Sequence, residues 1–188
     1  MNKFLYDSLA KSWIRPNGTV WLYADPHFGD TKMNGLRHIN DEEQIKQINS
    51  IVTKNDTIVI LGDVGNLDAV RKIKAGYKVL IMGNHDKNVK ECYQVFDDVY
   101  EGPLMINNRV LLSHEPVYPL ANYFFNIHGH NHVHVVYDTN RYLNLCAELI
   151  NYKPISLKQI IFDRQALKHT GNIHRDAIDR GIINSWKH

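Results

Sequence analysis

Apolar runs and amphipathic stretches alternate along the first half of the chain. Three runs rich in β-branched and aromatic residues predict buried strands, at residues 19–24, 57–61 and 77–82. Residues 41–53 place isoleucine and valine at helical spacing, and residues 66–74 form a shorter amphipathic stretch that Gly76 ends. A strand followed by a helix, repeated in this way, predicts an α/β fold in which the strands run parallel.

Beyond residue 100 the pattern changes to short apolar segments separated by turns. Residues 104–106 and 109–112 flank Asn107 and Asn108, and asparagine tolerates the positive φ angles of a tight turn, so a hairpin is predicted here. Another strand is predicted at residues 124–127. A second hairpin is predicted from residues 133–137 and 142–146. We therefore expect a mixed, largely antiparallel second half within a single domain.

Polar side chains that can bind metal follow the predicted strands. They occur in the order Asp25-Pro-His27, Gly62-Asp63, Gly83-Asn84-His85-Asp86, the isolated His114 and Gly129-His130-Asn131-His132. In open α/β sheets, groups at the carboxyl ends of neighbouring strands gather along one edge. Carboxylate, amide and imidazole ligands gathered there suffice for two metal ions and suit the metal-assisted hydrolysis of a phosphate ester.

Each motif has an ordinary structural explanation when taken alone. Aspartate before proline commonly starts a turn, Gly-Asp can simply end a strand, and an isolated histidine such as His114 is usually a core or surface residue. The run from His128 to His134 is harder to explain in this way, because four histidines at a spacing of two share one face of an extended segment. The ordered occurrence of these motifs after successive strands favours a common site.

The composition is typical of a globular protein from a reducing compartment. A length of 188 residues, with 44% hydrophobic and 22% charged side chains, suits one domain. The two cysteines, Cys92 and Cys146, lie among apolar residues and predict buried thiols rather than a disulfide framework. Neither a signal peptide nor an apolar run of membrane-spanning length is visible, so we expect a cytoplasmic protein that does not contact a membrane.

The net charge of +2 is unevenly distributed along the chain. Residues 164–188 carry five basic and two acidic side chains, so the remainder of the chain is close to neutral. The nearly neutral charge of residues 1–163 does not favour nucleic acid as a partner, although it does not exclude short or single-stranded nucleic acids as substrates. Apolar positions within residues 164–188 recur at helical spacing, which predicts a helix docked on the body, with a dimer contact or a basic arm as alternatives.

The ordered motifs together resemble the calcineurin-like metallophosphoesterase family, in particular its small single-domain members of prokaryotes and phages. The resemblance covers about residues 19 to 160 and includes residues 151–156, which are similar to the closing segment of that branch. It implies a four-layer α/β sandwich, with two mixed β-sheets packed face to face and helices outside them. Residues 1–163 would then form the metallophosphoesterase domain and residues 164–188 a C-terminal helical extension.

The resemblance also implies a set of ligands for two divalent metal ions. The first ion is expected to bind Asp25, His27 and His132. The second is expected to bind Asn84, His114 and His130, with Asp63 bridging both ions. The resemblance and the mixed imidazole and carboxylate ligands favour Mn²⁺, with Fe, Zn²⁺, Ni²⁺ and Mg²⁺ as alternatives. A hydroxide between the two ions would be the nucleophile.

Two further residues are expected to take part in catalysis. His85 matches the histidine of the family that is not a ligand and that protonates the leaving group or stabilises the transition state. Asp86 is expected to fix the tautomer of His85 and to raise its pKa. Asn84 would orient the substrate phosphate as well as bind metal, and Arg37 and His38 are candidate phosphate contacts in the loop after the first strand.

The chain departs from the family pattern at two places. The motif Gly-Asp-x-x-Asp reads Gly62-Asp63-Val-Gly-Asn66 here, so that an amide replaces the last acid at a position that usually supports the ligands. The histidine run also contains two residues beyond the expected pair. We expect His128 to support the ligands from behind and His134 to be exposed.

The predicted function is a dinuclear metal-dependent phosphodiesterase or phosphomonoesterase. No insertion is long enough to form a lid, so an accessible groove is expected, with a nucleotide or a nucleic-acid end as the natural substrate. A nuclease with the same metal chemistry is the first alternative. A non-enzymatic scaffold of the same fold is the second, and it is disfavoured because every ligand position is filled. The sequence is compatible with either a monomer or a homodimer.

Overall fold

Two β-sheets form the centre of the protein. The computed structural model describes residues 12–86, 88–106, 109–120, 124–132 and 141–161. The five-stranded sheet has the order β4 (Asp98–Tyr100), β3 (Tyr77–Ile81), β2 (Thr57–Leu61), β1 (Val20–Ala24) and β9 (Ile155–Ser156). The four-stranded sheet has the order β5 (Leu104–Met105), β6 (Val110–Leu112), β7 (Phe125–His128) and β8 (Tyr142–Asn144).

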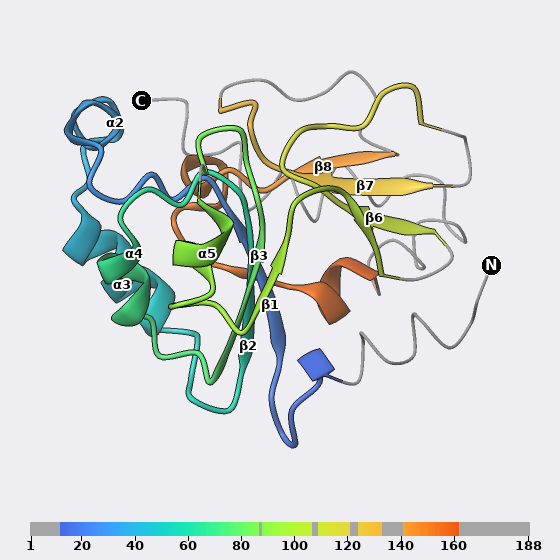
Figure 1. Cartoon of the computed structure of the whole chain (residues 1–188), viewed down its shortest axis with the longest axis horizontal. Coiled ribbons are helices and arrows are strands. Elements are labelled where there is room, and N and C mark those ends of the chain that lie inside the picture. The colour runs from blue at the N-terminus through green and yellow to red at the C-terminus, as the bar shows by residue number, and fades with distance from the viewer. Residues whose placement is uncertain (1–11, 87, 107–108, 121–123, 133–140, 162–188) are drawn as a thin grey trace.

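Short helices follow the strands of the first sheet. They are α2 (Thr31–Arg37), α3 (Asp41–Asn49), α4 (Leu67–Arg71) and α5 (Val89–Cys92), and a 3₁₀-helix, η1, covers Ala147–Ile150. Figure 1 shows α2, α3 and α4 on one side of β1, β2 and β3, and β6, β7 and β8 on the other side. The predicted α/β fold, with two mixed sheets flanked by helices, is confirmed.

The three central strands run parallel and end at the same level. Ala24 pairs with Leu61, and Leu61 pairs with Ile81, so the last residues of β1, β2 and β3 lie side by side. The residues that follow these strands therefore emerge along one edge of the sheet. This is the edge at which the sequence predicts the metal ligands.

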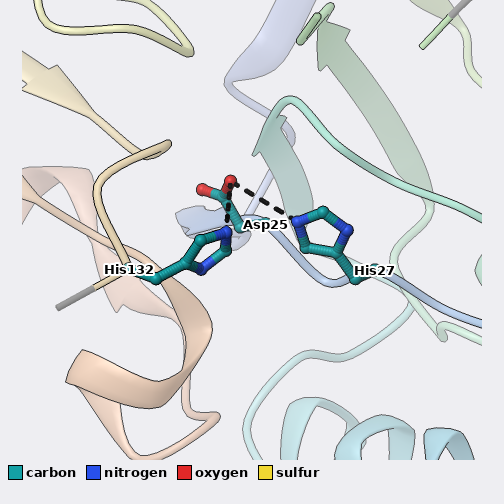
Figure 2. Close-up of side chains that lie close together, drawn as sticks. All are labelled: Asp25, His27 and His132. Atoms are coloured by element: carbon teal, nitrogen blue, oxygen red, sulfur yellow. Dashed lines mark ion pairs between the residues drawn. The ribbon is translucent and has the colours of Figure 1, made fainter. Parts of the chain in front are cut away.

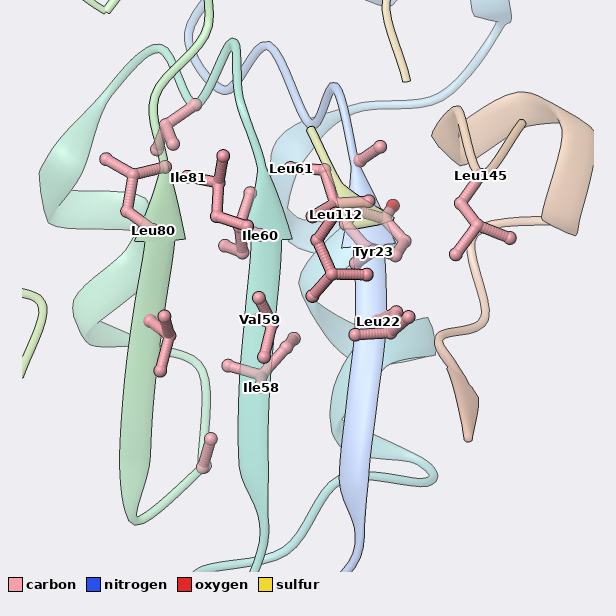
Figure 3. Packing of buried hydrophobic residues seen from close by; sticks show 14 of the residues in the cluster. Leu22, Tyr23, Ile58, Val59, Ile60, Leu61, Leu80, Ile81, Leu112 and Leu145 are labelled. Atoms are coloured by element: carbon pink, nitrogen blue, oxygen red, sulfur yellow. The ribbon is translucent and has the colours of Figure 1, made fainter. Parts of the chain in front are cut away.

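One apolar core joins the two sheets. All five residues of β2 are buried, as are the last three residues of β1 and of β3. Figure 3 shows Leu112 of β6 and Leu145, which follows β8, packed on the side of the first sheet that carries Leu22 and Leu61. Each fully buried aliphatic side chain of this kind stabilises the fold by about 1.5–3 kcal/mol.

A backbone bridge also connects the two sheets directly beneath the predicted site. Ala24, at the end of β1, forms an isolated parallel bridge with Cys146, which follows β8. Within the second sheet, the amide of Leu145 donates to the carbonyl of His128 at 2.7 Å, and the amide of Gly129 donates to the carbonyl of His114 at 2.8 Å. The ends of β6, β7 and β8 are thus held together, and the bridge ties them to the carboxyl edge of the first sheet.

The second half differs from the predicted, largely antiparallel arrangement. The strands β5 and β6 are antiparallel, as the first predicted hairpin requires, but β6–β7 and β7–β8 are parallel. The segments that precede β7 and β8 are long enough to return the chain to the opposite end of the sheet, which parallel pairing requires. The turn at Asn107–Asn108 and the predicted strand at 133–137 lie outside the described residues, as does the predicted extension at 164–188.

We expect the Ile60→Ala substitution to lower the free energy of unfolding by about 2–5 kcal/mol, because it opens a cavity in a fully buried position of β2. Urea unfolding followed by circular dichroism measures this change. The matched control is Leu36→Ala, since Leu36 is 74% exposed, and its effect should stay within about 0.5 kcal/mol. Equal losses in the two variants would contradict the assignment of Ile60 to the core.

Candidate metal centre

Four predicted ligands have an unusual backbone conformation. Asp25, His27, Asp63 and His130 have positive φ angles of 53°, 49°, 50° and 68°. Residues other than glycine rarely adopt this region, and each such residue costs about 1–3 kcal/mol unless its surroundings hold it there. These positions follow β1, β2 and β7 directly, so the strained turns aim their side chains into one space.

Backbone hydrogen bonds hold the first two strained turns side by side. The amide of Asp25 donates to the carbonyl of Gly62 at 3.2 Å, and the amide of His27 donates to the carbonyl of Asp63 at 3.0 Å. Gly62 itself has a φ of 76°, and a Cβ at this position would collide with the ring of His114. The loops after β1 and β2 therefore continue the parallel pairing of the strands into the site.

The first cluster consists of Asp25, His27 and His132. Asp25 Oδ1 lies 4.0 Å from His27 Nε2 and 3.9 Å from His132 Nε2, and Figure 2 shows both rings directed at this oxygen. Asp25 Oδ1 and His27 Nε2 are buried and have no hydrogen-bond partner. Unpaired buried polar atoms are costly, so a divalent cation between them fits this arrangement.

The second cluster consists of Asp63, His114 and His130, with Asn84 beside them. His114 Nε2 lies 2.9 Å from Asn84 Oδ1, 3.1 Å from His130 Nδ1 and 3.4 Å from Asp63 Oδ2. Its Nδ1 lies 3.1 Å from the carbonyl of Leu61, which can only accept a hydrogen bond. With Nδ1 protonated for that bond, Nε2 directs a lone pair toward the oxygens of Asn84 and Asp63, an arrangement that a cation stabilises.

Asp63 lies between the two clusters. Its Oδ1 accepts the amide hydrogen of His85 at 3.0 Å, which fixes the orientation of the carboxylate. Its Oδ2 lies 3.7 Å from His27 Nε2 and 3.4 Å from His114 Nε2. A single oxygen of Asp63 therefore faces both groups of ligands.

Burial shifts the protonation of the first cluster. Desolvation raises the pKa of Asp25 to about 6, against the favourable charge of His114 and the hydrogen bond from the His130 amide. Desolvation likewise lowers the pKa of His27 to about 4, so this ring is neutral at physiological pH and keeps a lone pair for a metal ion. A bound cation favours the ionised form of Asp25 and the neutral form of His27.

The second oxygen of Asp25 is already occupied. Asp25 Oδ2 accepts the amide hydrogen of His130 at 2.9 Å and the thiol hydrogen of Cys146 at 3.3 Å. Burial raises the pKa of the Cys146 thiol far above its ordinary value, so it stays protonated and donates. These contacts leave Oδ1 as the oxygen of Asp25 that is directed at the cluster.

His132 is supported by an ion pair that sequence reasoning missed. Its Nδ1 lies 2.8 Å from Glu148 Oε1 of η1, and Glu148 Oε2 lies 2.8 Å from Arg37 Nη2 of α2. The hydrogen bond with Glu148 raises the pKa of His132 despite its partial burial. No local pattern marks Glu148, because its partners come from distant parts of the chain.

The side chain of Arg37 is buried and does not lie where its predicted role as a phosphate contact requires. Its side chain is only 4% exposed, and Nη1 donates to the carbonyl of Pro26 at 3.2 Å. Burial raises the pKa of Glu148, but the hydrogen bond with His132 and the charge of Arg37 outweigh it, so the pKa is lowered overall. The buried guanidinium therefore balances the charge of Glu148 instead of facing an open site.

Asp86 makes contacts that differ from those predicted for it. Its carboxylate accepts the amide hydrogens of Asp63, Val64 and Gly83 at 2.8–2.9 Å. Among the described residues, no hydrogen bond joins Asp86 to the ring of His85. The expected contact that would fix the tautomer of His85 is thus missing, because backbone donors occupy both oxygens of Asp86. Asp86 instead ties the loop after β3 to the loop after β2.

His85 itself lies at the open side of the site. Its side chain is 68% exposed, and Nε2 lies 4.0 Å from Asp63 Oδ2. The ring also lies edge-on to that of His27, with 5.9 Å between the ring centres. His85 is therefore beside the ligands but accessible to a bound molecule.

The remaining predicted positions lie around this centre. Asn66 is exposed and caps α4, with its side chain accepting the amide hydrogen of Asp68 at 2.9 Å. His128 is fully buried, and desolvation lowers its pKa to about 4; its Nδ1 lies 2.8 Å from the carbonyl of Gly129. His38 is exposed at the end of α2. His134 lies outside the described residues.

An α/β sandwich that gathers two groups of cation ligands at its strand ends is an arrangement typical of metal-dependent hydrolases. The family model of the calcineurin-like phosphoesterases matches residues 18–181. This match spans most of the chain, and the protein belongs to the calcineurin-like phosphoesterase family. That family acts on phosphate esters with two metal ions, in agreement with the two clusters.

Two proteins are similar to this chain in sequence. The uncharacterized protein MJ1445 of Methanocaldococcus jannaschii is 28% identical over 166 residues, which cover 76% of this chain and 89% of that protein. The gene 66 protein of Mycobacterium phage L5 is 32% identical over 81 residues, 36% of this chain and 39% of the phage protein.

A solved structure shares the fold over most of its length. The protein of unknown function AQ665 from Aquifex aeolicus superimposes with a TM-score of 0.62 and 24% sequence identity. The superposition covers 78% of this chain and 99% of that chain. Within the described part of our chain, none of the helices has the length and apolar character needed to cross a bilayer.

We expect Gly129→Ala to abolish high-affinity metal binding, because a Cβ at this position would collide with Asp25 Oδ2 and lie 2.8 Å from the Cβ of Ala24. Isothermal titration calorimetry with Mn²⁺ measures the loss. Gly102→Ala is the matched control, since its Cβ would meet no atom within 4 Å, and it should bind as the wild type does. Wild-type affinity in Gly129→Ala would contradict the close packing of Gly129 against Asp25.

We expect Glu148→Gln to weaken Mn²⁺ binding by about 10- to 100-fold, because the neutral amide removes the counter-charge of Arg37 and orients His132 less firmly. The same titration measures the effect. Glu42→Gln, at an exposed position of α3, controls for the loss of one negative charge. If both variants bind Mn²⁺ equally well, Glu148 has no role in positioning His132.

Proposed function

We propose that this protein is a dinuclear metal-dependent hydrolase of phosphate esters. In this proposal Asp25, His27 and His132 hold one divalent ion. Asn84, His114 and His130 hold the other, and Asp63 contacts both. The observation that carries the proposal is Asp63 Oδ2, a single carboxylate oxygen that faces a histidine nitrogen of each cluster at 3.7 Å and 3.4 Å. The unpaired Asp25 Oδ1 and His27 Nε2 support it further.

Two divalent ions bound at these clusters supply Lewis acidity toward phosphate oxygens and lower the pKa of water. The chain supplies the geometry. The hydrogen bond from the His85 amide holds Asp63 in one orientation, and Asp86 holds the loop that carries Asn84 and His85 against β2. The site is thus assembled before substrate arrives, which is the condition for strong electrostatic stabilisation of a transition state.

Asn84 and His85 are the groups best placed to contact the substrate. Asn84 is exposed and its Oδ1 is directed at His114, so its Nδ2 hydrogens are available to a phosphate oxygen. His85 is exposed beside Asp63 and is suited to donate a proton to the departing oxygen. Asp86 assists through the backbone, by holding the turn that presents both residues.

Mn²⁺ is the metal that we propose for both positions. Imidazole, carboxylate and amide ligands without thiolate suit Mn²⁺, Fe or Zn²⁺ better than an ion that prefers oxygen alone. Cys146 does not alter this choice, because its thiol is protonated and donates to Asp25. Comparing Mn²⁺, Fe²⁺, Zn²⁺, Ni²⁺ and Mg²⁺ in one assay tests the preference.

Purified protein loaded with Mn²⁺ should hydrolyse bis-p-nitrophenyl phosphate, and Asp63→Ala should lower kcat/KM by at least about 1000-fold, because it removes the only carboxylate proposed to contact both ions. Release of p-nitrophenol measures the rate. Asp63→Asn, which retains an acceptor for the His85 amide, separates loss of charge from loss of fold.

The control for this experiment is Asp68→Ala, because the Asp68 side chain is 84% exposed on α4 and belongs to neither cluster. It should retain wild-type turnover. Absence of turnover of bis-p-nitrophenyl phosphate and of p-nitrophenyl phosphate with all five metals would overturn the proposal and favour the non-enzymatic scaffold. Faster cleavage of single-stranded oligonucleotides, with strong dependence on salt, would favour the nuclease alternative.

A further inference from the structure

A groove of about 480 Å³ opens beside the first cluster. His27, His85 and His132 line one part of it. The rest is lined by residues of the loops and helices that follow β1, β2 and β3, among them Asp30, Met33, Leu67 and Glu91. The groove therefore runs from the predicted reaction centre onto the surface formed by α2, α4 and α5.

The position of the groove indicates which part of a substrate it would hold. His27 and His132 of the first cluster line it, as does the proposed proton donor His85, whereas Asp63, His114 and His130 do not. A phosphate over the two clusters would thus project its organic group past His85 into the groove. A volume of about 480 Å³ is that of a pocket for one small organic molecule.

The walls of the groove are apolar and acidic. Met33 and Leu67 are half-buried and present apolar side chains. Asp30 Oδ1 accepts the amide hydrogens of Lys32 and Met33, and the hydrogen bond from Met33 is the largest cause that keeps the pKa of Asp30 below its ordinary value. Asp30 is therefore ionised at neutral pH.

Glu91 adds a second carboxylate to the same groove. Its Oε1 accepts a hydrogen bond from the side chain of Asn88 at 2.7 Å, and the residue is otherwise exposed. No lysine or arginine lines the groove among the described residues, although Lys32 and Lys90 belong to the same helices. Among the lining residues that the structure describes, the charged side chains other than the histidines are therefore all carboxylates.

We propose that this groove binds the organic group of the substrate and selects it by charge, favouring a small cationic group such as an aminoalkyl chain over a neutral one, and a neutral one over an anionic one. This proposal rests on the proposed function, since it assumes that phosphate binds at the two clusters. Asp30 and Glu91 attract the ammonium group, and Met33 and Leu67 pack against its alkyl chain.

The same charges act against a polyanionic substrate. A polynucleotide or a polyphosphate would bring its next phosphate toward Asp30 and Glu91, and like charges at short range repel each other. Small monomeric phosphate esters are therefore the class of substrate that the groove accepts.

Three phosphate monoesters of similar size and different charge test the proposal: phosphoethanolamine, n-propyl phosphate and phosphoglycolate. Their dissociation constants for the Mn²⁺-loaded protein are measured by calorimetry, and their inhibition constants against bis-p-nitrophenyl phosphate by turnover. Phosphoethanolamine should bind about tenfold more tightly than phosphoglycolate, with n-propyl phosphate between them. Raising the NaCl concentration about tenfold, from about 0.05 M to about 0.5 M, should reduce this ratio of dissociation constants, because salt screens the interaction between the charges.

The double variant Asp30→Asn, Glu91→Gln should bring the ratio close to one. Both substitutions keep the hydrogen-bond acceptors that hold α2 and α5, so they remove charge without removing the caps. Asp68→Asn removes one negative charge outside the groove and should retain the wild-type ratio.

Affinities that do not depend on the charge of the ester would overturn the proposal, as would a charge preference that survives in the double variant. Tighter binding of phosphoglycolate or of a short oligonucleotide would overturn it as well. Calorimetry separates this proposal from the proposed function. A protein that binds the three esters in the predicted order but hydrolyses neither bis-p-nitrophenyl phosphate nor p-nitrophenyl phosphate with any of the five metals retains the groove proposal and contradicts the enzymatic one.

Discussion

The level ends of β1, β2 and β3 are the constraint on which the candidate site depends. Ala24, Leu61 and Ile81 are neighbours across the sheet, so the chain leaves all three strands at one height. The turns that follow then continue in contact, with the amide of Asp25 bonded to Gly62. A shift of one residue in register would reverse the faces of a strand and separate the ligands, and the fully buried β2 opposes such a shift.

The site itself opposes folding in the absence of a cation. Three features of the site are unfavourable on their own. They are the residues with positive φ angles, the unpaired buried carboxylate oxygen of Asp25 and the converging lone pairs around His114. The shared apolar core holds them together, since side chains from both sheets pack in one cluster. Binding of cations to the folded state alone would in turn stabilise the fold by mass action.

Sequence reasoning succeeded where the signal is local. Each ligand motif lies within a few residues of the end of an apolar run, so both the strand and the group that follows it can be predicted together. It failed where partners are distant in sequence. The parallel pairing of β7 with β6 and β8 depends on long connections. The ion pair of Arg37 with Glu148 joins α2 to η1, and neither residue has a local pattern that predicts it. Asp86 was predicted to contact the ring of His85, but its hydrogen-bond partners are backbone amides of its own turn and of the turn after β2.

The groove shares His27 and His132 with the proposed ligands, but its acidic residues are not ligands, and this difference has a consequence for specificity. The proposed ligands lie in tight turns whose close contacts leave almost no room for substitution, as at Gly129 beneath Asp25. The acidic residues of the groove, in contrast, are Asp30, which caps the short helix α2, and Glu91 of α5, and both are held by few contacts. Substitutions on these helices can change the charge of the groove without moving a ligand. Under the two proposals, proteins with such a centre would keep one phosphate chemistry while the organic group that they accept changes, and the ligand motifs alone would then not identify the substrate.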